Sequence, residues 1–453
     1  MNWLCRAHFK NFVGVQMRNM ANSFVNHHTK KSFPSSPSLP TGLFSGGVKS
    51  NPTYRRKTIL HVSFQDPLHM TGGQWVVIWN LVKEQIKLGY KTVWVSLRIQ
   101  GEKSEQYFLK RRLRVRRIKI SDSDAITTPN EGNERKRFRR GREFGDQFVR
   151  LIQRHYRAEE TYIHLHGFYG EAQRASQLKA MGYNVTSTYH VVLSARLATT
   201  KEDEPFLPRL KKLERKSILV NDKIILNAPG TREELRELAP DYAGHIYIIP
   251  NGVEDEFFEL PKQKPDQKPL ISAYGRIAPE KGFELLIDAA KILSERANFL
   301  IFGKNDFTER TRAQYYNFLK NKAEGIGCIQ WDIRQAGVRG AEKISYVDRS
   351  SIGVIPSLYE PFGIVMLEYL SRGRPIITTL TQGAKYILGV QRTGRTPFGF
   401  VVDRNPRSVA KATQWLLDHP REARRMGQEG KRLAQHYRWA NINEQTLAVY
   451  KSI

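Results

Sequence analysis

Short apolar runs alternate with longer amphipathic stretches from Thr58 to the end of the chain. An apolar run of about four to eight residues is typical of a buried parallel strand, and apolar positions three or four residues apart are typical of a helix. Their alternation predicts an α/β protein with doubly wound sheets, because strands joined through helices pair in parallel. The expected strands are 58–64, 92–97, 113–120, 161–166, 184–190, 245–250, 270–276, 298–303, 328–331 and 352–356.

The same pattern predicts helices and a domain boundary. Residues 74–88 have helical spacing, as do residues 144–156, which follow a polar, charged insertion over 121–145. Residues 260–269 are rich in proline and charge, which is typical of a linker. With 453 residues, 40% of them hydrophobic, the chain can fill two cores. We expect a disordered basic extension over 1–57, domains over 58–262 and 263–436, and a terminal helix over 437–453.

Positive charge is concentrated in two stretches of a chain whose net charge is +29. Residues 1–65 contain nine Lys and Arg and no acid, and residues 103–142 contain fourteen against five acids. Such a field attracts polyanions, namely nucleic acid, an anionic membrane surface or a phosphorylated substrate, without selecting one of them. No apolar run reaches the ~18–20 residues that cross a bilayer. We therefore expect a cytoplasmic protein that is soluble or peripheral on the inner face of the membrane.

The N-terminal 31 residues place apolar side chains from Phe9 to Phe24 on roughly one helical face, beside basic residues. A membrane-surface helix and a mitochondrial-type presequence both fit this pattern. A disordered extension or a misassigned start fits it equally. The two cysteines, Cys5 and Cys328, are far apart in different contexts, so they indicate neither a disulfide framework nor a metal cluster.

The most informative stretch is 357–368. A Pro-Phe-Gly turn there joins an apolar run to a helical segment. Amide N–H groups at a helix start lack intrahelical partners, so they can bind hydroxyls or phosphate oxygens. Glu360 and Glu368 are eight residues apart, which on a helix is roughly 80° and ~12 Å, so they could hold two ends of one elongated ligand. Two solvated glutamates flanking a core helix are the alternative.

Other candidate ligands follow the ends of predicted strands. Arg276 and Lys281 stand between a strand and a helix, where arginine can bind phosphate through two parallel hydrogen bonds and lysine adds a point charge. His166 and His190 end two strands, at the sheet edge where α/β proteins bind ligands. The Gly72-Gly73 pair lets a backbone approach a ligand at a helix start. Surface cations, structural histidines and a plain turn are the alternatives.

Together, the two glutamates around Pro-Phe-Gly and the Gly-Arg and Lys-Gly pairs of the second half resemble the signature of family-4 nucleotide-sugar glycosyltransferases. The resemblance covers Thr58 to the C-terminus. It implies the GT-B architecture, in which two Rossmann-like domains face each other across a cleft and the terminal helix crosses back to the first. The catalytic residues implied are His190, Arg276, Lys281 and Glu360. The donor-binding residues implied are Gly72, Gly73, Arg276, Lys281, Phe362, Gly363, Ile364 and Glu368.

The resemblance also implies individual roles and a reaction. Glu360 would bind the donor sugar, Glu368 the ribose, and Arg276 with Lys281 the diphosphate, while His190 would lie beside the reaction centre. The reaction would move a hexosyl unit from a UDP- or GDP-sugar to a hydroxyl of a saccharide or lipid-linked acceptor, with retention of configuration. Polysaccharide, lipopolysaccharide or glycolipid biosynthesis would be the setting. We expect no cofactor, no metal and no specific nucleic acid partner.

Some positions limit these expectations. Asp122 and Asp124 have the spacing with which metal-dependent glycosyltransferases of another fold bind manganese, but ordinary linker residues surround them. Arg374 stands where the family usually has a small residue. Residues 382–385, which are Gln-Gly-Ala-Lys, stand where the family usually has a Gly-Gly turn followed by an acid. Both departures add positive charge near the expected acceptor side or cleft, which leaves the acceptor open. A nucleotide-sugar epimerase and a non-catalytic polyanion-binding protein remain alternatives.

Overall fold

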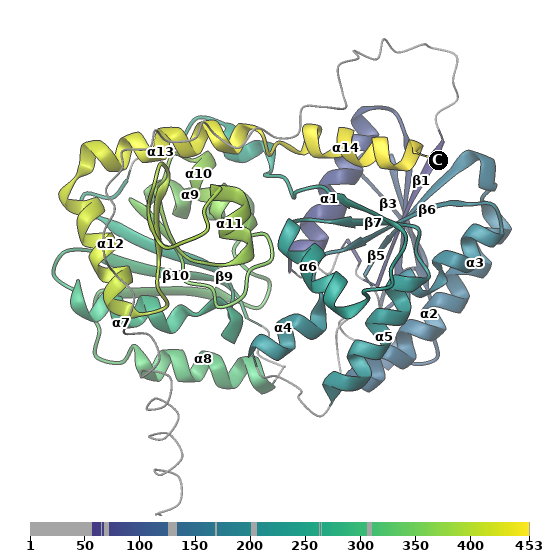
Figure 1. Cartoon of the computed structure of the whole chain (residues 1–453), viewed down its shortest axis with the longest axis horizontal. Coiled ribbons are helices and arrows are strands. Elements are labelled where there is room, and N and C mark those ends of the chain that lie inside the picture. Colours follow the sequence, from purple (N-terminus) through teal and green to yellow (C-terminus); the bar gives the residue numbers. More distant parts are fainter. Residues whose placement is uncertain are drawn as a thin grey trace, which may run out of the picture. The chain divides into compact units, whose positions relative to one another are not determined.

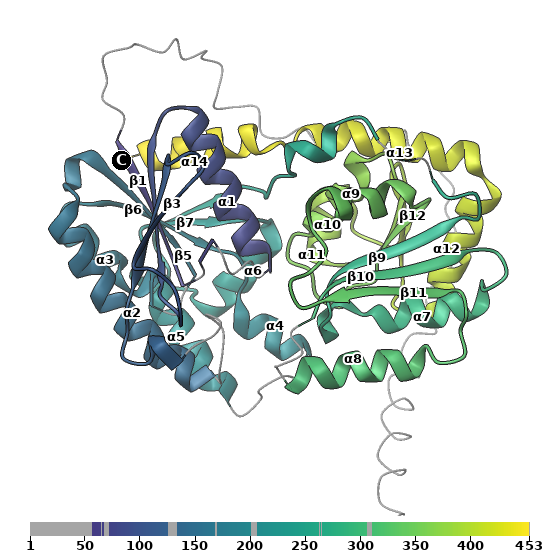
Figure 2. The same ribbon diagram turned by 180° about the vertical axis from the view of Figure 1, so that it is seen from behind.

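The computed structural model describes residues 57–64, 66–67, 72–125, 134–167, 170–200, 206–261, 263, 265–305 and 310–452. The extension expected over 1–57 lies outside the described residues, except for Lys57. Figure 1 shows two sheets, each flanked by helices, and Figure 2 shows the same arrangement from behind. Among the residues so described, no helix is both long and apolar enough to cross a bilayer.

The first sheet has eight strands in the order β3-β4-β2-β1-β5-β6-β7-β8. Only β3 is antiparallel to its neighbour. The strands are β1 (Thr58–Ser63), β2 (Lys91–Leu97), β3 (Glu105–Phe108), β4 (Leu113–Ile118), β5 (Thr161–His166), β6 (Asn184–Tyr189), β7 (Lys223–Leu226) and β8 (His245–Ile248). The accompanying helices are α1 (Gly72–Lys87), α2 (Glu134–His155), α3 (Ala175–Ala180), α4 (Leu193–Thr200), α5 (Leu207–Leu219) and α6 (Pro229–Leu238).

The second sheet has seven strands in the order β11-β10-β9-β12-β13-β15-β14, with only β14 antiparallel. The strands are β9 (Leu270–Arg276), β10 (Asn298–Lys304), β11 (Ile329–Arg334), β12 (Ile352–Ile355), β13 (Ile376–Thr379), β14 (Gly394–Thr396) and β15 (Gly399–Val402). The later helices are α7 (Phe283–Ile292), α8 (Arg310–Lys322), α9 (Gly340–Arg349), α10 (Ile364–Ser371), α11 (Gln382–Leu388), α12 (Pro406–Asp418), α13 (Pro420–Gln435) and α14 (Trp439–Lys451). The predicted class, two doubly wound α/β units, is confirmed.

Short 3-10 turns connect several of these elements. The described ones are η1 (Ser123–Ala125), η2 (Ala158–Glu160), η3 (Ala172–Arg174), η5 (Asp255–Phe258) and η6 (Pro279–Lys281). Each of the ten strands expected from the sequence overlaps an observed strand. The strands β3, β7, β13, β14 and β15 were not among them, because each is only three or four residues long.

The two faces of β1 differ in polarity. Leu60 and Val62 belong to an apolar core that also contains Phe144 and Phe148 of α2. Because side chains alternate along a strand, His61 lies on the other face. On that face Ile59 packs with Tyr450 of α14. The first sheet therefore has one apolar face against α2 and one face with buried polar groups against the C-terminal helix.

The last helix of the chain is attached to the first sheet. Asn184 Nδ2 of β6 donates a hydrogen bond to the Tyr450 carbonyl at 2.8 Å, and Lys223 of β7 bonds to the carbonyl of Ser452. The chain enters this helix beside the segment that follows β8, where Val253 N donates to Tyr437 O at 2.7 Å. In Figures 1 and 2, α13 accompanies the second sheet and α14 the first.

Two helices begin earlier than the sequence predicted. The helix expected to begin at 144 begins at Glu134, so the end of the supposed insertion is helical. Phe138 within it is only 5% exposed, while the basic residues around it mask the pattern. Gly141 also lowers helix propensity, but its backbone is in close contact with Gly170, where a Cβ would lie 1.8 Å from the Gly141 carbonyl oxygen. Similarly, α1 begins at Gly72 rather than at residue 74.

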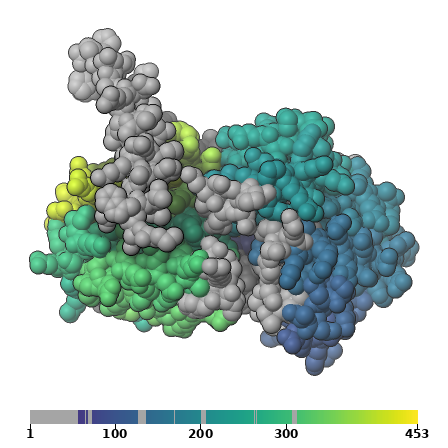
Figure 3. Space-filling view, turned by 90° about the horizontal axis from the view of Figure 1, so that it is seen from below, coloured from purple at the N-terminus to yellow at the C-terminus, as the bar shows by residue number. Residues whose placement is uncertain are grey.

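The chain joins the core of the second sheet before the predicted linker at 260–269. Val253 and Phe257 are both fully buried in a cluster with Leu270, Phe302 and other residues of the second sheet. The prolines and charges at 260–269 therefore form a connection on the second unit rather than the passage between sheets. In Figure 3 the earlier residues of the first unit form a blue surface, and residues of the second unit form a green one.

Candidate active site

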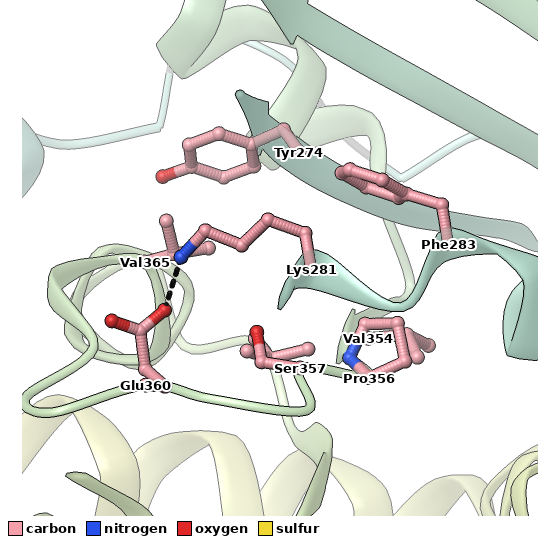
Figure 4. Close-up of a pocket in the computed structure, with 9 residues that line it drawn as sticks. Tyr274, Lys281, Phe283, Val354, Pro356, Ser357, Glu360 and Val365 are labelled. Carbon is pink, nitrogen blue, oxygen red and sulfur yellow. Dashed lines mark hydrogen bonds and ion pairs between the residues drawn. The ribbon is translucent and has the colours of Figure 1, made fainter. Parts of the chain in front are cut away.

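The candidate pocket lies at the carboxyl ends of β9 and β12. The order β10-β9-β12 reverses the winding direction at β9, and ligands of open α/β sheets bind at such a point. The polar side chains that line the pocket are those of Tyr274, Lys281, Ser357 and Glu360 (Figure 4). The rest of the lining is apolar or proline, so charges within it are poorly solvated.

Lys281 and Glu360 meet directly. Lys281 Nζ lies 2.5 Å from Glu360 Oε2, and the two side chains are 21% and 12% exposed. Figure 4 shows the lysine chain extended across the pocket toward the carboxylate. Gly282 makes this approach possible, because its φ is +62° and a Cβ there would lie 2.3 Å from the Pro356 carbonyl oxygen. The sequence predicted both residues for the site but did not predict that they pair.

Arg276 ends β9 and is paired within its own loop. Its Nη2 lies 2.5 Å from Oε1 of Glu280, which is only 6% exposed at the side chain. Burial opposes ionisation of Glu280, but Arg276, Arg196 and Lys281 outweigh it and lower the pKa of Glu280 to about 2. Glu280 therefore stays ionised and holds Arg276 near the pocket. Nothing in the sequence indicated this role, because Glu280 is one acid among many charged residues.

Glu368 is buried, 5% exposed, and both carboxylate oxygens have partners. Lys343 Nζ of α9 lies 2.7 Å from Oε1, and the hydroxyl of Tyr274 donates to Oε2. Lys343 also lies 3.5 Å from Glu254, and its pKa is raised because these two carboxylates outweigh its burial. Tyr274 and Lys343 therefore orient Glu368. Tyr274 could have been suspected from its place two residues before Arg276, but nothing in the sequence singled out Lys343.

The start of α10 is shaped by two glycines. Gly363 has φ +96° and precedes Ile364, the first residue of the helix, while Phe362 is buried. Gly383 of α11 packs on this turn, since a Cβ there would lie 1.8 Å from the Phe362 carbonyl oxygen, and its N–H donates to Glu360 O at 2.9 Å. The start of α10 thus lies beside Glu360, since a Cβ on Gly363 would lie 3.2 Å from Glu360 Cγ.

His190 follows β6 in the first sheet, with His166 directly behind it. His190 Nε2 lies 3.2 Å from His166 Nδ1, and Asn227 Nδ2 donates to the His190 carbonyl at 3.2 Å. Burial lowers the pKa of His190 to about 3, so the ring is neutral at physiological pH. His166 is fully buried, so it supports His190 instead of facing a ligand.

Gly72 and Gly73 form the first turn of α1 instead of a loop before it. A Cβ on Gly73 would meet nothing within 4 Å, so packing does not require glycine there. The next side chain, Gln74, anchors the turn by donating to the His166 carbonyl at 2.9 Å and to Ser63 Oγ at 3.2 Å. The helix start is thereby fixed near the end of β5.

The two aspartates with the spacing of a manganese site are bound to cations of the chain. Asp122 is held by Arg139 at 3.0 Å and Arg140 at 2.8 Å, and Asp124 by Lys119 at 2.8 Å. These carboxylates point to separate cations rather than to a common position.

Arg374 is not where the sequence suggested. It precedes β13, so it lies at the amino edge of a parallel strand, whereas the pocket lies at the carboxyl edge. The expected positive charge on the acceptor side therefore does not come from Arg374. Residues 382–385 do follow the carboxyl end of β13, but they form the first turn of α11 with Thr381 as its cap.

A hydrogen bond links α6 to the loop that carries Glu360. The hydroxyl of Tyr359, next to Glu360, donates to Glu234 Oε2 of α6 at 3.0 Å. Burial raises the pKa of Glu234 to about 7. Neither residue was singled out from the sequence.

Two family models match the chain in succession. The model described as Glycosyltransferase Family 4 matches residues 71–257, and that described as Glycosyl transferases group 1 matches residues 254–433. The chain belongs to the group 1 glycosyltransferases, family 4. The two matches meet close to Val253, where the chain leaves the first sheet for the core of the second.

Curated relatives agree with this family. The glycosyltransferase is 24% identical over 411 residues to mannosylfructose-phosphate synthase from Agrobacterium fabrum, covering 84% of this chain and 86% of the relative. It is 22% identical to alpha-maltose-1-phosphate synthase from Mycolicibacterium smegmatis, covering 53% and 66%. It is 29% identical to an uncharacterized glycosyltransferase from Methanocaldococcus jannaschii, covering 51% and 60%. These last two matches span less than two thirds of the relatives' own length.

Solved structures share the fold. Sucrose-phosphate synthase from Thermosynechococcus elongatus superposes with a TM-score of 0.72 at 20% identity, covering 87% of this chain and 98% of that one. A structure described as trehalose-6-phosphate from E. coli bound with UDP-2-fluoro glucose superposes with a TM-score of 0.64 at 12% identity, covering 88% and 100%. The glycosyltransferase therefore has the GT-B fold that the sequence predicted.

Proposed function

We propose that this glycosyltransferase moves a hexosyl unit from a UDP- or GDP-sugar to a hydroxyl group, with retention of anomeric configuration. The observation that carries the proposal is the convergence of Arg276, Lys281 and Glu360 at the carboxyl edge of the second sheet, beside the start of α10. Two cations and free helix N–H groups suit a diphosphate, and a carboxylate suits sugar hydroxyls. The E. coli structure bound with UDP-2-fluoro glucose shares the fold and supports a nucleotide-sugar donor.

The existing ion pairs indicate how the site would respond to a donor. Lys281 is neutralised by Glu360, and Arg276 by Glu280. A diphosphate entering between the cations would take over Lys281, releasing Glu360 to accept hydrogen bonds from the sugar hydroxyls. Glu280 would remain with Arg276, because several cations keep it ionised. The cations are thus positioned in advance, which is the condition under which electrostatic stabilisation contributes most to a rate.

The chemical step follows from these roles. The bond between the anomeric carbon and the leaving phosphate oxygen breaks, and a bond from that carbon to the acceptor oxygen forms on the same face. The acceptor proton passes to the leaving phosphate. Arg276 and Lys281 stabilise the charge that develops on the diphosphate. No enzyme nucleophile takes part, and the phosphate charge is met by side chains and helix amides, so we expect no metal or cofactor requirement.

The acceptor is proposed at the level of its chemistry. A saccharide or a lipid-linked sugar would offer the attacking hydroxyl. Relatives named for mannosylfructose-phosphate and D-inositol 3-phosphate make a phosphorylated sugar the first acceptor class to test. Association with an anionic membrane surface is a further proposal. It is supported by exposed basic residues along α2, which are Lys136, Arg139, Arg142, Arg150 and Arg154.

A donor screen tests the proposal. A panel of UDP-, GDP- and ADP-sugars is added to the protein, and the melting temperature is measured, since a ligand that binds only the folded state raises it. The best donor is then incubated with sugar and sugar-phosphate acceptors, and nucleoside diphosphate release is followed. Conversion of the donor sugar without an acceptor would indicate an epimerase. Absence of both binding and turnover with every donor, alongside binding to polyanions, would indicate a non-catalytic protein.

A further inference from the structure

One glutamine and three histidine side chains of the first unit form a continuous series of hydrogen bonds that ends at His190. Gln85 Oε1 of α1 lies 2.8 Å from His61 Nε2, and His61 Nδ1 lies 3.0 Å from His166 Nε2. His166 Nδ1 then lies 3.2 Å from His190 Nε2. The first three side chains are fully buried. The chain therefore connects the interior between α1 and the sheet with the end of β6.

The sheet register brings these histidines together. His61 of β1 is the register partner of His164 in β5, and Ser63 is that of His166. Alternation along each strand places His61, His164 and His166 on one face. That face also receives Tyr450 of α14. Buried polar side chains need partners, and the ring nitrogens of His61 and His166 find theirs within this cluster and its two ends, Gln85 and His190.

The donor and acceptor roles along this series of hydrogen bonds follow from Gln85. The Gln85 amide presents Oε1 to His61, while its buried Nε2 has no hydrogen-bond partner among the described residues. Because a carbonyl oxygen can only accept, this orientation of the amide places the His61 proton on Nε2 and leaves Nδ1 as an acceptor. His166 must then donate from Nε2 to His61, which leaves its own Nδ1 as an acceptor for His190. Burial lowers the pKa values of all three rings, to about 4 for His61, well below the ordinary value for His166 and to about 3 for His190. Each ring is therefore neutral and carries a single N–H proton, on either Nδ1 or Nε2.

We propose that the chain from Gln85 through His61 and His166 selects the tautomer of His190, so that its Nε2 carries the proton and its Nδ1 presents a lone pair. Among the described residues, Nδ1 of His190 has no hydrogen-bond partner. The substrate group that meets it must therefore be a hydrogen-bond donor. In this glycosyltransferase that group is a hydroxyl, from the donor sugar or from the acceptor. The inference rests on the proposed function for the identity of this substrate.

A metal site is the competing explanation for these histidines. Ring nitrogens of His61, His164 and His166 lie within 4.8 Å of one another. However, His164 Nδ1 lies 2.6 Å from the Tyr450 hydroxyl, and His164 Nε2 lies 2.6 Å from Thr188 Oγ1. Both of its nitrogens are therefore engaged, one as donor and one as acceptor. With His61 and His166 also bonded at both nitrogens, the cluster is hydrogen-bonded as a relay rather than arranged as three open ligands.

His61 and His166 are thus positioning residues, and His164 provides a matched control. His164 is as deeply buried as His61 and lies in the same layer, but its partners lead to Tyr450 and Thr188 instead of to His190. His61→Phe removes a link of the chain, and Gln85→Met removes its first acceptor without changing any histidine. His164→Phe removes a comparable ring outside the chain. Melting temperatures are compared first, so that only folded variants are carried forward.

The first measurement is made on the free enzyme. Histidine is labelled with ¹⁵N, and the His190 signals are assigned by their loss in His190→Asn. We expect Nε2 protonated and Nδ1 unprotonated in the wild type and in His164→Phe. In Gln85→Met and His61→Phe we expect a mixture of tautomers. An Nδ1-protonated His190 in the wild type, an unchanged tautomer in both chain variants, or stoichiometric metal in the purified protein would overturn the proposal.

The second measurement uses turnover. With the donor found by the screen, kcat/KM should fall about tenfold in Gln85→Met and His61→Phe, the loss expected for one misdirected hydrogen bond, and should stay within about twofold in His164→Phe. Deoxy-sugar donors identify the hydroxyl, because the donor lacking it should react equally with wild type and Gln85→Met. Alternatively, if Gln85→Met slows transfer from every deoxy donor and leaves hydrolysis of the donor without acceptor unchanged, that result would assign the hydroxyl to the acceptor. Equal loss in all three variants would refute the relay. Absent turnover in the wild type with the expected tautomer would refute the proposed function alone.

Discussion

The ion pair between Lys281 and Glu360 allows catalysis and stability to be separated. We consider Lys281→Met, Glu360→Gln and the double variant. Fully exposed ion pairs contribute about 0–1 kcal/mol, whereas removing one partner of a buried pair costs about 3–5 kcal/mol. This pair is 2.5 Å apart with side chains 21% and 12% exposed, so it falls between these limits. Each single variant should lose ~2 kcal/mol, which in a domain of this size lowers the Tm by about 4–8 °C.

The double variant should behave differently in the two assays. Because no charge remains unpaired in the pocket, its Tm should return to within about 3 °C of the wild type. Transfer should not return, since the diphosphate has lost a cation and the sugar a carboxylate. Each single variant should lose about 10²–10³ in kcat, the usual effect of removing one preorganised electrostatic contact, and the double variant at least as much. Nucleoside diphosphate release by a coupled assay measures this.

A surface pair on α7 is the control. Lys291 lies 3.7 Å from Asp288 and is 49% exposed, so Lys291→Met should change neither Tm nor turnover appreciably. The reasoning would be refuted by near-normal turnover in Lys281→Met or Glu360→Gln. It would equally be refuted if the double variant regained activity together with stability, because the pair would then be structural.

Other contacts lead to three further predictions. Turnover should be unchanged in EDTA. It should also be unchanged in the variant with both Asp122→Ala and Asp124→Ala, because both carboxylates are bound to Arg or Lys. Loss of activity in EDTA and its recovery with manganese would contradict this. Burial raises the pKa of Glu234 from 4.5 to about 7, so the contribution of its protonated carboxyl to stability is complete below pH 4.5 and is lost as pH rises through 7. Glu234→Gln should therefore flatten a plot of Tm against pH between these values. An unchanged slope would argue against this assignment. The enzyme should float with anionic liposomes at low salt and not at high salt, since each basic residue near the surface contributes ~1 kcal/mol that salt screens, and equal binding to neutral liposomes would count against an electrostatic contact.

The parts of the site that the sequence predicted are those carried by short local patterns. The strand, turn and helix around Glu360, and the strand and loop around Arg276 and Lys281, each span 20 residues or fewer. Local periodicity and turn residues determine such units, so their place at the carboxyl edge of a parallel sheet followed directly. The overall α/β class followed for the same reason.

The parts that were missed depend on contacts between distant residues. Lys343 meets Glu368 only after α9 has packed beside β9 and α10, and its own surroundings in the sequence resemble those of any exposed helix. His61 and His166 are 105 residues apart and become neighbours through the register of β1 and β5. Arg374 was misjudged because its neighbours in sequence are near the site, although Arg374 itself precedes β13 and therefore lies at the opposite edge of the sheet.

The attachment of α14 to the first sheet makes that unit discontinuous in the gene. Its last strand, β8, ends at Ile248, and the helix that covers Ile59 and His164 begins at Trp439. A ribosome adding about 5–20 residues per second needs ~10–40 s to synthesise the intervening segment. During that interval the nascent first unit exposes apolar and histidine side chains that α14 buries in the complete protein. Expression of residues 58–262 alone should consequently give aggregated protein, and a soluble first unit needs the C-terminal helix joined back to it through a designed connection.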